Sequence, residues 1–343
     1  MFAYQEPRVR FRKLNNIGLE GKNSEVFTIH DQNLNATLVI KEVVKNSGYY
    51  DPKYYEEAQI MYKSTHPNVV RVLYACEDDD KIYVATPYYS KGSLKSYMEH
   101  RHLTVREIIQ FSCQFLNGLQ NVHAKKLIHF DIKPDNILLS DRMEALLADF
   151  GQSKEIDENG LAVQPYQYSK ILPPEYFGNP QYIFDQRTDI YQAGLTMYRM
   201  CVGDSAFNQQ LQRFADMHQF GLALRKENFP DKNAYPLHIP RALQNVINKC
   251  LKANPIQRYQ SAISVINALA DIDGTILDWQ YEITGDHRQV WFHESGGYIR
   301  KIVVCPANSS QAFKHKVDGN ERRVTKFCKA KITDNEIIQF LTT

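Results

Sequence analysis

Two short segments near the middle of the 343-residue chain constrain its fold most strongly. The first reads His-Phe-Asp-Ile-Lys-Pro-Asp-Asn-Ile-Leu over residues 129–138, and the second is Asp149-Phe150-Gly151. Asp-Phe-Gly alone is a common tripeptide and carries little weight. In this order, with Asn136 thirteen residues before Asp149, the two segments place two carboxylates, one amide and one ammonium group on two adjacent loops.

This set of side chains matches what the transfer of a phosphoryl group requires. One carboxylate orients the accepting hydroxyl, a second carboxylate and an amide oxygen hold Mg²⁺ against the phosphates, and a lysine offsets charge on the moving group. We therefore interpret Asp131 as the base that faces the hydroxyl and Lys133 as the lysine near the γ-phosphate. Asn136 and Asp149 are the predicted metal ligands.

With these segments the sequence resembles the eukaryotic-like, or Hanks-type, protein kinase family, over residues 10–270. The resemblance implies a bilobal α+β fold, with a β-rich N-lobe over residues 1–88 and a helical C-lobe over residues 89–272. ATP and Mg²⁺ are the implied cofactors. Lys133, two residues after the base, resembles the Ser/Thr-specific subgroup, so proteins with Ser or Thr acceptors are the implied substrates, and tyrosine as a further acceptor stays open.

The resemblance also implies a site for the nucleotide. Lys41 resembles the strand lysine that holds the α- and β-phosphates, and Glu57, nine residues before His66, resembles its partner on the next helix. Thr86 falls at the gatekeeper position, and adenine is expected to bond the carbonyl of Pro87, which needs no N–H group there, and the amide of Tyr89. The other residues expected at the nucleotide are Ile17, Gly18, Gly21, Val26, Val39 and Leu138.

The glycine-rich loop departs from the family pattern. Aligned on Val26, its three glycine positions hold Leu19, Gly21 and Ser24, and Gly18 is displaced by one residue. Because Gly21 occupies the position of closest backbone approach to phosphate, we expect weaker nucleotide binding rather than its loss.

A second departure is Phe130, which replaces the arginine that pairs with a phosphate on the activation loop in many family members. Phenylalanine offers no guanidinium to a phosphate, so we predict that activity does not depend on phosphorylation of this loop. Between Asp149 and Glu175 the loop has no threonine, and its hydroxyl groups belong to Ser153, Tyr166, Tyr168 and Ser169.

Three further motifs correspond to structural parts of the family. Pro173-Pro174-Glu175 resembles its Ala-Pro-Glu motif, residues 189–194 resemble its central helix, and Arg258 resembles the arginine that pairs with Glu175. Small-molecule kinases of related fold usually lack these parts, which disfavours that alternative.

A second alternative is a catalytically weak, ATP-binding scaffold that acts through partner binding. The departures of the glycine-rich loop and of Phe130 from the family pattern motivate this alternative. Inactive relatives typically lose one or more of the core catalytic residues. This chain keeps all five of them, which favours an active enzyme: Lys41, Glu57, Asp131, Asn136 and Asp149.

Periodicity predicts the main elements. Strands are expected over residues 37–43 and 81–86, with a helix between them that is capped by Asp51, begins at Pro52 and carries Ala58, Met61 and Tyr62 on its apolar stripe. Longer helices are expected over 103–123, 188–201 and 239–253. In the tail we expect strands over 281–283, 290–292 and 298–304 and a helix over 335–341.

The tail, residues 273–343, is predicted to form a small β-rich accessory domain. The chain is nearly neutral, with 41 Lys and Arg against 39 Asp and Glu, so any basic surface must be local. Between Arg300 and Lys331 lie nine basic residues and only two acidic ones, Asp318 and Glu321; the basic ones are Arg300, Lys301, Lys314, Lys316, Arg322, Arg323, Lys326, Lys329 and Lys331.

Two interpretations of this basic segment stay open, a solvated strand face and a docking site for an acidic partner. The basic residues within 322–331 partly alternate along a predicted strand, which would gather their charge on one face. Phe327 is the only aromatic residue close by, so an acidic protein is favoured over nucleic acid as the partner.

The sequence also bears on location. Six scattered cysteines form no C-x-x-C pair, the first residues lack the apolar core of a signal peptide, and no run of 18 apolar residues occurs. We therefore expect a cytoplasmic protein with no membrane span.

Overall fold

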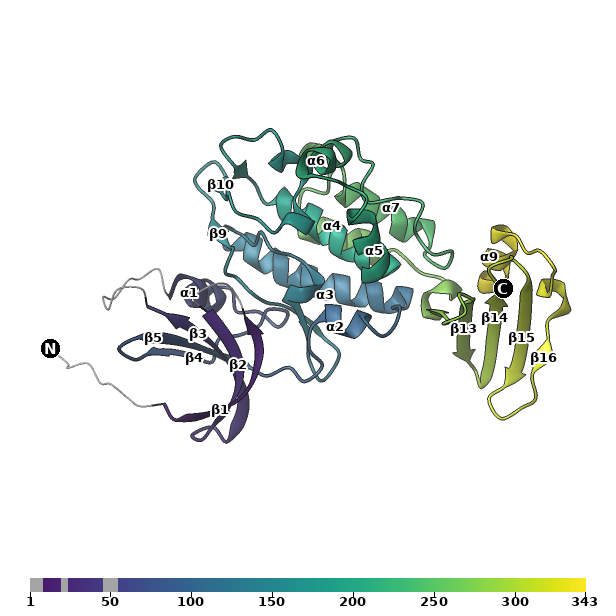
Figure 1. Ribbon diagram of the computed structural model, residues 1–343, viewed down its shortest axis with the longest axis horizontal. Coiled ribbons are helices and arrows are strands. Elements are labelled where there is room, and N and C mark those ends of the chain that lie inside the picture. Colours follow the sequence, from purple (N-terminus) through teal and green to yellow (C-terminus); the bar gives the residue numbers. More distant parts are fainter. Residues whose placement is uncertain (1–8, 20–23, 46–54) are drawn as a thin grey trace.

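The computed structural model describes residues 9–19, 24–45 and 55–343. It has a β-rich N-terminal lobe, a larger helical lobe and a C-terminal sheet that lies at the end of the molecule away from the N-terminal lobe (Figure 1). This arrangement confirms the predicted α+β bilobal architecture with an added β-rich tail.

The N-terminal lobe is a five-stranded antiparallel sheet with one helix. The strands lie in the order β1-β2-β3-β5-β4, so β5 returns beside β3. Their apolar side chains form a compact core that includes Phe27, Ile29 and Ile40, all fully buried. The elements are β1 (Phe11–Leu19), β2 (Ser24–Asp31), β3 (Ala36–Val44), α1 (Glu56–Lys63), β4 (Tyr74–Glu77) and β5 (Lys81–Pro87).

Both strands predicted in this lobe are confirmed as β3 and β5. The predicted cap Asp51 and first residue Pro52 lie outside the described residues, and α1 begins at Glu56. Ala58 and Met61 are buried as expected, but Tyr62 is 73% exposed. The prediction for Tyr62 was wrong because the buried face of this one short helix is narrower than the apolar stripe of the sequence.

The helical lobe is built around two long helices. In α3 (Val105–Ala124), Thr104 and Glu107 form a capping box, and the apolar stripe from Ile108 to Val122 is buried. Every residue of α4 (Arg187–Val202) from Thr188 onward is buried, so this helix forms the centre of the lobe. The other helices are α2 (Leu94–Met98), α5 (Asp204–Leu211), α6 (Met217–Arg225), α7 (Arg241–Cys250) and α8 (Ala262–Ala270).

Among the described residues, the chain between α3 and α4 forms three two-stranded sheets. The pair β7 (Ile137–Leu139) and β8 (Ala145–Leu147) spans the residues between the two motifs of the sequence. The other pairs hold the segment that follows residue 151, and they are β6 (Leu127–Ile128) with β9 (Lys154–Glu155) and β10 (Ala162–Val163) with β11 (Ile183–Phe184).

The C-terminal sheet has five antiparallel strands in chain order and one helix, α9 (Asp334–Thr342). The predicted tail helix and three tail strands are confirmed, while the sequence analysis missed the fourth strand. The strands are β12 (Gln280–Ile283), β13 (Gln289–Ser295), β14 (Tyr298–Val304), β15 (Ser310–Lys316) and β16 (Arg322–Arg323).

The strand predicted over residues 322–331 is confirmed only at Arg322–Arg323, because β16 ends there. A 3₁₀ turn, Thr325–Phe327, follows it and brings the Phe327 ring inward, where its centroid lies 5.2 Å from that of Phe340 on α9. Burial of this aromatic ring therefore replaces the expected alternation.

The C-terminal sheet and the helical lobe share one apolar core, which includes Trp279, Trp291 and Phe340. Trp291 Nε1 donates to His238 Nδ1 over 3.2 Å, and the Arg106 guanidinium binds both oxygens of Asp278 at 2.5 and 2.8 Å. The core is thus continuous across residue 273, and the domain boundary placed there stays a prediction.

Within the described ranges, no helix combines the length and the apolar character that a membrane crossing requires. All six cysteines are free thiols.

The buried His238 gives a prediction about stability and pH. Burial, and after it the nearby His102, lowers the pKa of His238 from 6.5 to about 3, so the folded protein holds it neutral. In the unfolded chain, His238 takes up a proton near pH 6.5. The free energy of unfolding therefore decreases as the pH falls from 6.5 toward 3, by up to about 1.4 kcal/mol per pH unit, because protonation favours the unfolded state. We expect the Tm to fall between pH 6.5 and 4.5.

The matched variant is His238→Asn, whose amide oxygen can still accept the hydrogen bond from Trp291. Thermal unfolding of both proteins across this pH range should show a flatter decline for the variant. Identical slopes would mean that His238 does not contribute to the pH dependence.

Candidate active site

A cavity of about 570 Å³ is lined by residues from the N-terminal sheet, α1, the segment after β5 and the loops around β7 and β8. Most of the residues predicted to bind nucleotide or metal meet here. They are Ile17, Val26, Val39, Lys41, Glu57, Thr86, Pro87, Tyr89, Asn136, Leu138 and Asp149.

The remaining predicted residues lie elsewhere. Gly18 belongs to β1, where its backbone is opposite Val26 of β2, and Gly21 lies outside the described residues. Asp131 and Lys133 do not line the cavity, but they contact each other. Asp131 also contacts Asn136, which lines the cavity.

Sequence analysis missed several residues of the cavity wall. Apolar side chains of Met61, Val70, Val84 and Ala148 complete its inner surface, and Asp135 and Lys95 contribute charge. These apolar residues belong to ordinary core patterns, so nothing in the sequence distinguishes them from other buried positions.

Lys41 stands at the centre of a charged cluster that joins the two lobes. Its Nζ lies 3.1 and 3.0 Å from the two carboxylate oxygens of Glu57 and 3.8 Å from Oδ1 of Asp149. The three side chains are only 22–26% exposed, and in such partly buried surroundings charge interactions are stronger than in water. The pair Lys41–Glu57 is therefore assembled, with α1 held close to β3.

Gly151 makes room for this cluster. A Cβ atom at residue 151 would lie 3.2 Å from Asp149 Oδ1 and 3.8 Å from Lys41 Nζ, closer to the carboxylate than side-chain carbons normally come. The backbone N–H of Gly151 also donates to Asp149 Oδ1 over 3.2 Å. A larger residue would push the Asp149 carboxylate away from the lysine.

Asp131 is held by two neighbours of its own loop. Lys133 Nζ lies 3.0 and 2.7 Å from its two carboxylate oxygens, and Asn136 Nδ2 donates to its Oδ2 over 2.7 Å. Asn136 Nδ2 also donates to the Asp131 carbonyl over 3.0 Å. Because the amide nitrogen of Asn136 is committed to Asp131, its amide oxygen is the atom left to bind a metal.

The loop that carries Asp131, residues 129–136, is held against the helix α4 by hydrogen bonds. The Asp189 carboxylate accepts the backbone N–H groups of His129 and Phe130, each over 2.8 Å. Gln192, one turn further on, accepts from the N–H of Ile132 over 3.1 Å and donates to the carbonyl of Phe130 over 2.9 Å. The polar side chains of this buried helix thus replace the missing backbone partners of the loop.

His129 has a structural position in this loop. It is fully buried, its Nδ1 accepts the backbone N–H of Asp131 over 3.3 Å, and its ring lies 4.8 Å from that of Phe150. Burial lowers its pKa below 6.5, so the ring is neutral. His129 therefore links the two motifs of the sequence by packing rather than by charge.

Phe130 packs into an apolar cluster instead of facing solvent. Its side chain is fully buried with Ile128, Ala162 and Phe184, and the Phe130 and Phe184 rings lie edge to face at 5.8 Å. Its backbone has a positive φ of 64°, a strained conformation for an aromatic residue. The N–H of Phe130 donates to Asp189 and its carbonyl accepts from Gln192, and these two hydrogen bonds hold the backbone in place.

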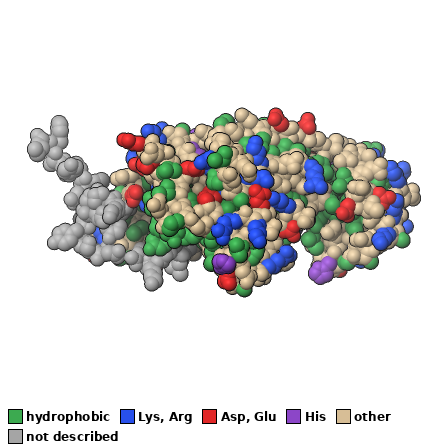
Figure 2. All heavy atoms as spheres, turned by 90° about the horizontal axis from the view of Figure 1, so that it is seen from above, with side chains coloured by type: hydrophobic (Ala, Val, Ile, Leu, Met, Phe, Trp, Pro, Cys, Tyr) green, Lys and Arg blue, Asp and Glu red, His purple; other side chains and the backbone are tan. Residues whose placement is uncertain are grey.

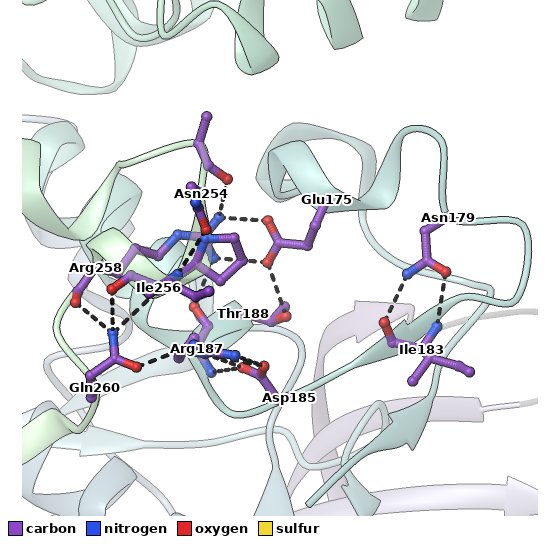
Figure 3. A network of polar contacts seen from close by, with 12 residues as sticks. Glu175, Asn179, Ile183, Asp185, Arg187, Thr188, Asn254, Ile256, Arg258 and Gln260 are labelled. Atoms are coloured by element: carbon purple, nitrogen blue, oxygen red, sulfur yellow. Dashed lines mark hydrogen bonds and ion pairs between the residues drawn. The ribbon is translucent and has the colours of Figure 1, made fainter.

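The predicted pair of Glu175 and Arg258 is confirmed. Arg258 Nη1 and Nη2 donate to the Glu175 carboxylate over 2.8 and 2.5 Å, and Thr188 Oγ1 donates to it over 3.3 Å (Figure 3). The guanidinium also donates to three backbone carbonyls and lies 4.8 Å from the Tyr191 ring. Because the buried charge is fully partnered, this network anchors the end of the segment between Asp149 and Glu175.

The donor atoms suit Mg²⁺. Asp149 supplies a carboxylate and Asn136 an amide oxygen to the same cavity, and Mg²⁺ prefers such hard oxygen ligands, together with water and substrate phosphates. Among the described residues, no group of three or more His, Cys, Asp or Glu side chains could hold a metal ion. A metal at Asn136 and Asp149 would therefore depend on phosphate oxygens to complete its coordination.

Comparisons with known proteins agree with this geometry. The model of the protein kinase domain matches residues 11–268. A probable serine/threonine-protein kinase of Clostridium perfringens is 27% identical, over 77% of this chain and 38% of its own length. The serine/threonine-protein kinase PknD of Chlamydia caviae is 26% identical, over 84% of this chain and 34% of its own. The chain thus spans about a third of the length of these relatives.

The contacts of Gln192 generate a prediction about the stability of the loop. Gln192→Leu would leave the buried N–H of Ile132 and the carbonyl of Phe130 without their partner, and each orphaned group costs about 1–3 kcal/mol. We expect the free energy of unfolding, measured by urea denaturation, to fall by at least about 2 kcal/mol.

Thr196→Val is the matched variant on the same helix, because Thr196 Oγ1 makes a single hydrogen bond, to the carbonyl of Ile132 over 3.2 Å. It should cost about 1 kcal/mol. If both variants lost equal stability, Gln192 would not have the bridging role described here.

Proposed function

Because the chain belongs to the protein kinase family, we propose that it is an active serine/threonine protein kinase that uses ATP and Mg²⁺. The observation that carries this proposal is the assembled charge set around one cavity. Lys41 is paired with Glu57 and lies within 3.8 Å of Asp149, while Asp131 is held by Lys133 and Asn136.

The residues take these roles in the proposed reaction. Adenine lies between Val39 and Leu138 and bonds the backbone of Pro87 and Tyr89, while Lys41 binds the α- and β-phosphates. When bound at Asn136 and Asp149, Mg²⁺ neutralises phosphate charge. Asp131 accepts the proton of the substrate hydroxyl, and Lys133 offsets the charge that develops on the γ-phosphoryl group.

A Ser or Thr acceptor is supported by Lys133. Its ammonium contacts the carboxylate of Asp131 and lies 4.4 Å from the centroid of the Tyr168 ring on the activation loop. The lysine is thus held between the proposed base and the loop that borders the substrate. The free thiols of all six cysteines fit the predicted cytoplasmic location.

We also propose that the enzyme works without phosphorylation of its activation loop. The apolar cluster of Phe130, Ala162 and Phe184 lies on the β10–β11 pair, so carbon–carbon packing supports the loop at the place where relatives pair an arginine with a phosphate. Ser153, one of the four hydroxyls of this loop, is buried at 3% exposure. Three hydroxyls remain at the surface, those of Tyr166, Tyr168 and Ser169.

Substitutions of the charged set test the proposed activity. We expect Lys41→Ala, Asp131→Ala and Asp149→Ala each to lower kcat by at least about 100-fold, because each removes a preorganised charge from the transferring phosphoryl group. The measurement is transfer of the γ-phosphate to a generic basic protein.

Lys45→Ala and Asp141→Ala are the matched controls, since Lys45 pairs with Glu77 and Asp141 binds Ser90, and neither control residue lines the cavity. Near wild-type turnover in Asp131→Ala would remove the base assignment. Absence of transfer by the wild-type protein, with ATP still bound, would favour the scaffold alternative.

A second set tests the independence from phosphorylation. The triple variant Tyr166→Phe, Tyr168→Phe, Ser169→Ala removes every exposed hydroxyl of the loop, keeps the aromatic ring on Lys133 and leaves the buried Ser153 in place. We expect kcat/KM within about threefold of the wild-type value, and no loss after phosphatase treatment. Loss of activity in a variant that remains folded would sink this proposal.

A further inference from the structure

A second cavity, of about 650 Å³, lies in the C-terminal sheet, between the outer strands β14 to β16 and the 3₁₀ turn after them. Five basic side chains and one exposed aromatic ring line it: Lys314, Lys316, Arg322, Arg323, Lys326 and Tyr298. Among the described residues that line it, none is acidic. Figure 2 shows Lys and Arg side chains gathered at the end of the molecule formed by this sheet.

The register of the sheet brings like charges directly opposite one another. Arg300 of β14 pairs with Lys314 of β15, and Lys314 pairs with Arg322 of β16. Like charges directly opposite on neighbouring strands destabilise a sheet. The facing pair of Lys314 and Arg322, both of which line the cavity, is therefore a placement that an anion would stabilise.

Other basic residues of the segment are satisfied within the protein. Arg300 Nη2 donates to the carbonyl of Phe340 and to Thr343, and its guanidinium lies 4.8 Å from the Phe340 ring. Lys329 forms an ion pair with Glu336 of α9. These contacts show that the fold does provide partners for basic residues where it uses them structurally.

The five basic residues of the cavity differ in this respect. None of them forms an ion pair with any other residue in the described part of the chain, and all five are exposed. The Nζ atom of Lys314 lies 5.3 Å from the centroid of the Tyr298 ring, and that of Lys326 lies 5.1 Å from the centroid of the Phe327 ring. Their positive charge is therefore available to a ligand that enters the cavity.

We propose that this cavity binds a phosphorylated segment of a partner protein. A phosphoserine or phosphothreonine carries close to two negative charges and three strong acceptor oxygens, which matches a compact group of guanidinium and ammonium groups better than a single carboxylate does. The cations surround one pocket rather than following a long stripe, and the one exposed ring is already contacted by Lys314. Both features disfavour single-stranded nucleic acid, which requires a basic groove with free stacking surfaces.

The cavity lies on the sheet at the far end of the molecule from the N-terminal lobe (Figure 1). A segment bound there would tether a protein near the enzyme and raise the effective concentration of its acceptor sites. This use in substrate selection rests on the kinase activity proposed above, whereas binding itself does not. Proteins that already carry a phosphate would then be the preferred substrates.

The test is a binding measurement with the full-length protein and no nucleotide. The probe is a fluorescein-labelled peptide of Gly and Ala with two phosphoserines, compared with its unphosphorylated form by fluorescence anisotropy. We expect the phosphopeptide to bind at least about tenfold more tightly. The variant Lys314→Gln, Arg322→Gln, Lys326→Gln should reduce this affinity at least about tenfold, and Arg322→Gln alone by a smaller factor.

The matched control is Lys301→Gln, Lys331→Gln, which removes basic residues of the same segment that do not line the cavity. It should change the affinity less than about twofold. Equal losses in the two sets, or equal binding of the unphosphorylated peptide, would overturn the proposal. So would tighter binding of inorganic tripolyphosphate or of a single-stranded RNA, which would assign the cavity to another ligand.

The two proposals fail separately in this design. Phosphopeptide binding by a protein that transfers no phosphate would overturn only the kinase activity. Normal transfer to a generic protein, without phosphopeptide binding, would overturn only the cavity proposal. Deletion of residues 275–343 is unsuitable as a test, because Trp279, Trp291 and Phe340 belong to the core of the helical lobe.

Discussion

The candidate active site depends most on the hydrogen bonds of one buried side chain, the carboxylate of Asp189. It accepts two backbone N–H groups of the loop that carries Asp131, and His123 Nε2 lies 2.7 Å from its Oδ2. Hydrogen bonds to an ionised acceptor are stronger than neutral ones, and more so away from water. They hold the positive φ of Phe130, and this turn directs Asp131 toward Lys133 and Asn136. The geometry of the proposed chemistry therefore depends on a side chain inside α4 that does not line the cavity.

The sequence was sufficient for much of the fold and for the charged residues of the site. The spacing of the two motifs and the apolar stripe of α3 could be predicted because both depend on residues that are close together in the sequence. Gln192 and Thr196 could not be assigned as supports of the loop, because their partners are backbone groups some 60 residues away in the chain. Side-chain type alone does not disclose such a partner.

Errors in the tail have a related physical origin. Residues 310–316 contain several polar side chains and were not predicted as a strand. They form β15 because their backbone pairs with that of β14. The basic residues within 322–331 partly alternate with uncharged ones, yet the strand stops at Arg323, and the Phe327 ring that follows is buried against Phe340 of α9. In both cases long-range contacts outweighed the local pattern.

The packing of Phe130 has a consequence for how the proposed kinase activity could be controlled. A loop that is held by a guanidinium and a phosphate can be released by a phosphatase or weakened by salt, since both act on charge. A loop that is held by buried aromatic rings responds to neither, and its order is acquired once, when the chain folds. The activity would then be controlled by the amount of the protein in the cell and by its binding partners, rather than by reversible phosphorylation near the proposed catalytic residues.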